Sequence, residues 1–84
     1  MLRIDISSDG QFTTIHLIGR LREEHIEELT LEIRKHNPPV ELDMGEVDLV
    51  DVEVVRFLGI CRSQGVRLLG CSQYIADWID KELS

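Results

Sequence analysis

The chain has 84 residues, which is enough for one hydrophobic core, and we therefore treat residues 1–84 as a single domain. Hydrophobic residues make up 43% of the chain and charged residues 30%, a mixture typical of a folded globular protein rather than a disordered one. Nine Lys and Arg against 16 Asp and Glu give a net charge of −7, which disfavours nucleic acid and anionic lipid surfaces as partners.

The amino-terminal residues alternate between apolar and polar types, with Leu2, Ile4 and Ile6 on one side of the alternation. This pattern predicts a strand rather than an export signal, and no apolar run approaches the roughly 20 residues that span a bilayer. We therefore expect a cytoplasmic protein without membrane insertion. A turn at residues 8–10 then leads to residues 12–18, which are rich in β-branched side chains and complete a β-hairpin that ends at Gly19.

A helix is predicted from Arg22 to His36, because apolar residues recur at i, i+3 and i+7 as Ile26, Leu29 and Ile33. It should stop at Asn37-Pro38-Pro39, since the residue before a proline is pushed out of the helical region.

A third strand is predicted at residues 40–44, followed by a loop at residues 45–50 whose Val47, Leu49 and Val50 pack beneath it. Asp51 is expected to cap the next helix, because its carboxylate can accept hydrogen bonds from the free amides of the first turn. The charge of Glu53 also suits the positive end of the helix dipole.

The buried stripe of this second helix is predicted to consist of Val54, Val55, Leu58 and Cys61. Gln64-Gly65 should close the helix, and residues 66–69 are typical of a short fourth strand. Ser72 is expected to cap a last helix, one face of which carries Tyr74, Ile75, Trp78 and Ile79.

The predicted order β-β-α-β-α-β-α indicates an α/β domain with a small mixed four-stranded sheet, in which an antiparallel hairpin is followed by parallel crossovers. In such sheets the functional edge lies at the carboxyl ends of the parallel strands. The loops expected there carry mostly acidic residues: Arg20, Arg22, Asp43, Glu46, Asp48, Asp51 and Glu53.

An acidic edge could hold a metal, perform acid–base chemistry or recognise a protein. The sequence contains no signature of a nucleophile beside a base, a phosphate-binding loop or paired metal ligands. Asp43 and Asp51 could bind a hard cation, but a strand-end residue and a helix cap are the more common roles. Cys61 and Cys71 are expected to be buried thiols, and the three histidines fall on different elements. We predict no enzyme, no metal and no cofactor.

Four segments carry a resemblance to a known family: residues 17–21, 40–47, 49–51 and 65–70. Together they resemble the STAS domain, the family of bacterial anti-sigma-factor antagonists and of the cytoplasmic domains of sulfate transporters. The resemblance covers roughly residues 3 to 82. It implies a STAS-like fold and a non-enzymatic protein-interaction module that regulates transcription by partner switching.

Members of this family typically present the start of the second helix to a kinase or anti-sigma factor, and a Ser or Thr there is phosphorylated. The family segment is of the Asp-Ser-Ser-Gly type, whereas this chain has Asp51-Val52-Glu53-Val54, so Glu53 stands at the acceptor position of a degenerate phosphorylation site. No Ser or Thr lies between Thr30 and Ser63 to replace it. Three interpretations stay open: a constitutive binder, a domain locked in a state like the phosphorylated one, or a Glu53 that only stabilises the helix start.

The resemblance therefore predicts a partner-binding set made of Arg20, Asp43, Asp51, Val52, Glu53 and Val54. Val52 is the expected surface residue, while Val54 fits either this set or the buried stripe. The expected partner is an anti-sigma factor or a kinase-like protein. Alternatives are an accessory role on the ATPase of a lipid-transport ABC complex and, less favoured, an enzyme that depends on a divalent cation.

Overall fold

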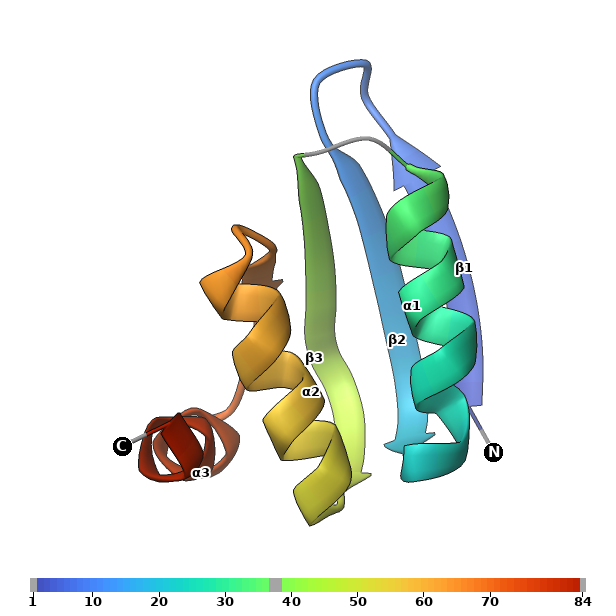
Figure 1. Ribbon diagram of the computed structural model, residues 1–84. Coiled ribbons are helices and arrows are strands. Elements are labelled where there is room, and N and C mark those ends of the chain that lie inside the picture. Colours follow the sequence, from blue (N-terminus) through green and yellow to red (C-terminus); the bar gives the residue numbers. More distant parts are fainter. Residues whose placement is uncertain (1, 37–38, 84) are drawn as a thin grey trace.

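The computed structural model describes residues 2–36 and 39–83 (Figure 1). The elements follow the predicted order. They are β1 (Leu2–Ser8), β2 (Thr13–Leu21), the 3-10 turn η1 (Glu23–His25), α1 (Ile26–Lys35), β3 (Val40–Val50), α2 (Val52–Ser63), β4 (Arg67–Leu69) and α3 (Gln73–Leu83). Every helix in the described ranges is too short or too polar to cross a membrane.

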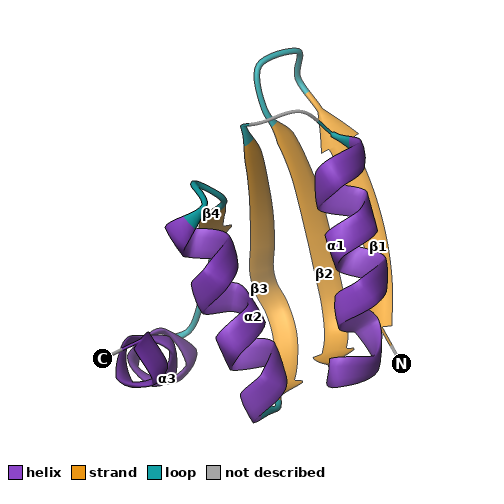
Figure 2. Ribbon diagram, in the orientation of Figure 1, coloured by secondary structure: helices purple, strands orange, loops and turns teal. Residues whose placement is uncertain are grey.

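The four strands form one sheet in the order β1-β2-β3-β4. Strand β1 pairs antiparallel with β2, whereas β3 runs parallel to both β2 and β4 (Figure 2). This arrangement confirms the predicted α/β class with a mixed four-stranded sheet. Because β1 and β4 stand at the two edges, each of them has a strand neighbour on one side only.

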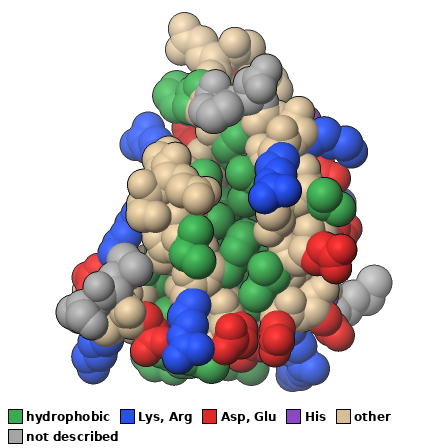
Figure 3. Space-filling model, viewed as in Figure 1, with side chains coloured by type: hydrophobic (Ala, Val, Ile, Leu, Met, Phe, Trp, Pro, Cys, Tyr) green, Lys and Arg blue, Asp and Glu red, His purple; other side chains and the backbone are tan. Residues whose placement is uncertain are grey.

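Helices α1 and α2 cross the same face of the sheet, and α3 packs against α2 (Figure 1). Side chains alternate along β2, so Ile15, Leu17 and Leu21 point toward the helices and are buried, while His16 lies on the opposite face. Apolar side chains from the helices and the sheet fill the space between α1 and α2 (Figure 3). The core also includes Leu29, Val40, Leu42, Met44, Val54, Val55, Leu58, Cys61, Ile75 and Ile79.

Strands β2 and β3 are longer than predicted. The predicted end of β2 at Gly19 is wrong, because the strand continues to Leu21, and the predicted loop at residues 45–50 is part of β3. The pairing register shifts twice, between His16 and Ile18 and between Gly19 and Arg20, so β3 accommodates extra residues as bulges. Leu49 is consequently 60% exposed rather than packed beneath a loop. Val47 and Val50 are partly buried against the core, as expected.

The helix boundaries agree with the predicted signals, with one difference at the start of the first helix. There a 3-10 turn precedes α1, and the Arg22 N–H donates to Nδ1 of His25 at 3.0 Å. Helix α1 ends at Lys35, while Asn37 and Pro38 of the predicted stop lie outside the described residues. The predicted cap of α3 is confirmed, because the Ile75 N–H donates to Oγ of Ser72 at 3.3 Å.

The predicted apolar face of α3 is partly wrong. Ile75 and Ile79 are buried and Trp78 is partly buried, but Tyr74 is 69% exposed. Its ring lies edge-on to Trp78, with 5.8 Å between the centroids. Helix α3 packs on α2 and not over the sheet, so a narrow stripe of its surface is covered.

Candidate functional site

Asp51 joins the amino-terminal end of α2 to the connection between β2 and α1. Its Oδ1 accepts a hydrogen bond from the Val54 N–H at 2.9 Å, which confirms the predicted helix cap. Its Oδ2 accepts from the Glu23 N–H at 3.0 Å, a contact that the sequence did not predict. Both carboxylate oxygens are therefore engaged with backbone donors, and the two chain segments that flank β3 are held together at this point.

Two shallow hollows meet at Asp51. One, of about 310 Å³, is lined by Arg20, Leu21, Arg22, Leu49, Val50 and Asp51. The other, of about 510 Å³, is lined by Arg22, Glu23, Glu24, Glu27 and Asp51. Of the residues predicted to gather at this edge, the structure thus brings together Arg20, Arg22 and Asp51. The acidic side of the cluster comes from the turn before α1 and from the first turn of α1, which the sequence-based prediction had not included.

Exposed apolar side chains lie beside these charges. Val52 is 38% exposed, which agrees with its prediction as a surface residue, and Leu49 is 60% exposed. Leu49 is opposite Arg20 in the β2–β3 register. We call Arg20, Leu49, Asp51 and Val52 the α2 rim. Leu49 was missed because a one-residue bulge moves a side chain to the other face of a sheet, and nothing in the sequence marks the bulge.

Val54 does not belong to the rim. Its side chain is fully buried in the core with Val55 and Leu58, so it cannot contact a partner. The prediction that included Val54 in a binding set is therefore wrong, and its alternative assignment to the buried stripe of α2 is confirmed. The cause is the helical period, which places Val54 on the same side as Leu58 and Cys61.

Glu53 lies in the first turn of α2, as predicted, and its carboxylate is directed along the helix. Its Oε1 accepts from Nη1 of Arg56 at 3.0 Å, and Nε of Arg56 donates to Oε1 of Glu82 at 2.9 Å. The hydrogen bond that Arg56 donates to Glu82, together with the charge of Glu53, raises the pKa of the Arg56 guanidinium above its usual range. Glu53 therefore takes part in an ion-pair network that joins α2 to α3.

Asp43 lies apart from the rim, and the prediction that it ends a strand is wrong because β3 continues to Val50. Asp43 pairs with His16, and Val50, the neighbour of Asp51, pairs with Leu21. At about 3.3 Å per residue, these five residues of β2 place Asp43 roughly 17 Å from the end of β3. The two carboxylates therefore cannot share a cation. Oδ1 of Asp43 accepts from the Gly45 N–H at 3.0 Å and Oδ2 contacts Nδ1 of His16 at 3.0 Å. The Gly45 bond, assisted by His16, lowers the pKa of the Asp43 carboxyl below its ordinary value.

Ser7, His16 and Asp43 form a hydrogen-bonded chain across β1, β2 and β3. Oγ of Ser7 lies 3.2 Å from Nε2 of His16, whose other ring nitrogen contacts Asp43. The order is that of a catalytic triad, but Ser7 is exposed and the side chains of His16 and Asp43 are 39% and 38% exposed. A reacting group there would be surrounded by water rather than by fixed donors, so we interpret the chain as cross-strand pairing.

The remaining predicted residues have separate roles. Glu46 and Asp48 are exposed along the bulged part of β3. Within residues 2–36 and 39–83, no three potential ligands are grouped as a metal site would require. Cys61 is buried, as predicted, and burial raises its pKa to about 11. Cys71 is only partly buried, so the prediction of full burial is wrong for it.

Comparison with known proteins identifies the fold. No protein-family model matches the chain, and no curated protein matches it. An anti-sigma-factor antagonist STAS domain from Rhodobacter sphaeroides aligns with a TM-score of 0.58 and 19% identity, over 83% of this chain and 85% of that one. The crystal structure of a protein named Mglu aligns with a TM-score of 0.61 and 21% identity over 77% of this chain. This chain spans only 18% of the length of Mglu. The architecture is that of a STAS domain.

Proposed function

Proceeding from the STAS fold, we propose that this chain is a protein-interaction module of the anti-sigma-factor-antagonist type, that it acts in the cytoplasm of a bacterium, and that it binds its partner through the α2 rim. The observation that supports this proposal is a pair of exposed apolar side chains close to charged ones: Leu49 shares a hollow with Arg20 and Asp51, and Val52 follows Asp51 in the chain. An apolar centre with a charged border is the usual composition of a protein contact surface.

The binding is proposed to be independent of phosphorylation at the helix start. The position of the usual acceptor is occupied by Glu53, and the chain contains no hydroxyl side chain between Thr30 and Ser63. The ion pair of Glu53 with Arg56 favours the interpretation that this glutamate stabilises α2 and its contact with α3. One fixed negative charge is also less than the charge of about −1.5 to −2 that a phosphate adds.

The experiment is affinity capture of the partner from native extract, followed by binding measurements with the purified pair. Val52→Asp should weaken binding at least about tenfold, because it places a charge in the apolar centre of the contact. Leu31→Asp is the matched control, since Leu31 is also an exposed apolar residue, 60% exposed, but lies on α1. Equal affinity of both variants for the partner would refute the α2 rim as the contact surface.

The same captured partner decides between the two regulatory settings. A kinase-like anti-sigma factor supports the leading proposal, and an ABC ATPase supports the role in a lipid-transport complex. With a kinase-like partner, addition of ATP should leave the complex intact and the mass of the chain unchanged. ATP-dependent release together with a phosphorylated species would contradict phosphorylation-independent binding.

A further inference from the structure

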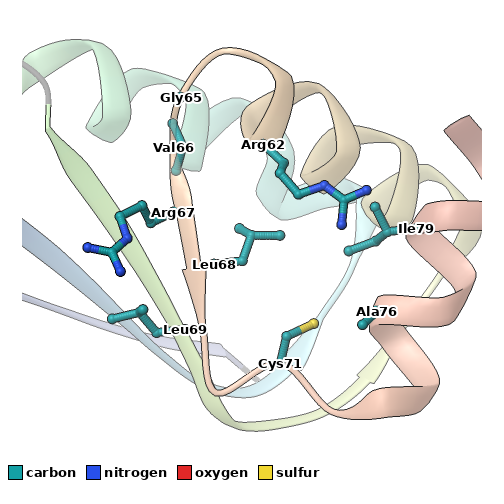
Figure 4. A pocket seen from close by; sticks show the side chains of 9 residues that line it. All are labelled: Arg62, Gly65, Val66, Arg67, Leu68, Leu69, Cys71, Ala76 and Ile79. Atoms are coloured by element: carbon teal, nitrogen blue, oxygen red, sulfur yellow. The ribbon is translucent and has the colours of Figure 1, made fainter.

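A groove runs beside β4, at the opposite end of α2 from the rim. It has a volume of about 480 Å³ and is lined by Arg62, Gly65, Val66, Arg67, Leu68, Leu69, Cys71, Ala76 and Ile79 (Figure 4). The side chains of Leu68 and Ile79 face each other across it, with Cys71 and Ala76 below them (Figure 4). The floor of the groove is therefore apolar.

The groove follows a free sheet edge. Strand β4 pairs with β3 on one side and is the last strand of the sheet on the other. Helix α3 does not cover this edge, because its main contact is with α2, which Arg62 reinforces through a 2.7 Å bond to Asp80. An edge strand beside a groove can pair with an added extended segment, through main-chain hydrogen bonds.

The geometry of β4 defines the side chains that such a segment would carry. Leu68 points to the apolar groove, whereas Arg67 and Leu69 point to the other side of the strand (Figure 4). An added strand has the same alternation, with one set of side chains toward Leu68, Ile79 and Ala76 and the next set beside Arg67.

The charge of Arg67 indicates which side chains suit the second set, the one that lies beside it. Arg67 is exposed, and among the described residues no carboxylate forms an ion pair with it, although Glu41 is its neighbour in the β3–β4 register. Arg62 lies on the groove side of β4 and is paired with Asp80. It is therefore the exposed Arg67 that favours acidic side chains on its side of the added strand.

We propose that the β4 edge is a second binding site, separate from the α2 rim, and that its occupant is an extended segment of a partner protein in which apolar and acidic residues alternate. The segment adds a fifth strand to the sheet next to β4. Its apolar side chains fill the groove over Leu68, Ala76 and Ile79, and its carboxylates lie next to Arg67.

The test uses a capped five-residue peptide of alternating valine and glutamate, followed by NMR on the full chain. Binding should shift the amide signals of residues 66–71 and 76–79 and slow the alkylation of Cys71, while the buried Cys61 serves as an internal reference. Arg67→Glu should weaken binding at least about tenfold. Arg3→Glu on β1 is the matched control and should leave the affinity unchanged.

Two peptide controls separate the proposed mode from general adhesion. A peptide with lysine in place of glutamate should bind at least about tenfold more weakly. A peptide methylated on every backbone nitrogen should lose binding, because it has no N–H left to donate to the strand. Equal binding of either control, no effect of Arg67→Glu, no binding at millimolar peptide, or shifts confined to the α2 rim would each overturn the proposal. Concentration-dependent shifts of residues 66–71 without peptide would overturn it in favour of a second copy of the chain.

Discussion

The two ends of α2 are held in place by different kinds of interaction. At the amino-terminal end, one side chain, Asp51, binds the backbone of both α2 and the β2–α1 connection. At the carboxyl-terminal end, the backbone itself provides the closure: Gly65 has a positive φ of 92°, and the Val66 N–H donates to the Cys61 carbonyl at 3.0 Å. About 18 Å of helix separate the two ends.

Because of this difference, the two ends of α2 should tolerate different substitutions. The amino-terminal end depends on the chemistry of a carboxylate and accepts changes of shape around it, since the rim residues are exposed. The carboxyl-terminal end of α2 and the strand β4 that follows it, together called the β4 end, depend on the close approach of backbone segments. This end accepts changes of charge, since Arg67 is exposed. Three predictions follow this contrast, from the largest effect on stability to the smallest.

The largest effect is expected from a methyl group at Gly70, where β4 leaves the sheet. Gly70 has a φ of 67°, and a Cβ there would lie 2.9 Å from the Gly45 nitrogen and 3.0 Å from its Cα. Gly70→Ala combines backbone strain with a clash against backbone, so it should lower the free energy of unfolding by about 2–4 kcal/mol in urea denaturation.

Gly65→Ala is the matched control for this effect. Its φ is also positive, at 92°, but a Cβ there meets nothing within 4 Å. The control should therefore cost only about 1 kcal/mol, from strain alone. If both variants lose the same stability, the close approach between β4 and the Gly45 bulge does not exist.

The next effect tests the amino-terminal end. Asp51→Ala removes both acceptors and leaves two backbone amides without a partner, so the free energy of unfolding should fall by about 1–3 kcal/mol. Glu53→Gln, two residues away, should cost less than about 0.5 kcal/mol, because the ion pair with Arg56 is exposed. Thermal unfolding followed by circular dichroism measures both. A larger loss for Glu53→Gln would show that the Arg56 network, rather than the cap, holds this end.

The sequence was sufficient to predict the order of the elements, the mixed sheet and the cap at Asp51, because hydrophobic period and capping residues are local signals. It could not reveal the bulges in β3, which arise from pairing with β2. As a result, the sequence-based prediction assigned residues 45–50 to a loop, did not include the exposure of Leu49 and put Asp43 at the end of a strand.

The candidate site was predicted only in part, because some of its features follow from local signals and others from contacts between distant segments. Asp51, Val52 and Arg20 follow from their place at an element boundary, which a sequence reveals. The burial of Val54 follows from the side of α2 that faces the sheet, and the bond between Asp51 and Glu23 joins residues 28 positions apart. The groove beside β4 depends on the contact of α3 with α2, and this contact has no local signature in the sequence.

The smallest effect concerns acid, and it links Asp43 to the β4 end. The folded chain lowers the pKa of Asp43 below 3.8, chiefly through the Gly45 N–H and further through His16. A carboxyl whose pKa is lowered by folding stabilises the fold when the pH is above the pKa of that group in the unfolded chain. This contribution disappears as the pH falls through the pKa of the group in the folded chain. Asp43→Asn should therefore be less stable than the parent at neutral pH, by less than about 1 kcal/mol since the side chain is 38% exposed.

The stability difference between the parent and Asp43→Asn should shrink as the pH falls through the lowered pKa of the folded carboxyl, where the parent side chain also becomes neutral. His16→Gln should keep most of the acid dependence, because the Gly45 bond remains. Since Gly45 lies against Gly70, acid should also lower the hydrogen-exchange protection of Leu68 and Leu69 before that of Val54. Loss of protection at Val54 first would mean that acid opens the α2 cap before the β4 edge, and the contrast between the two ends would be reversed.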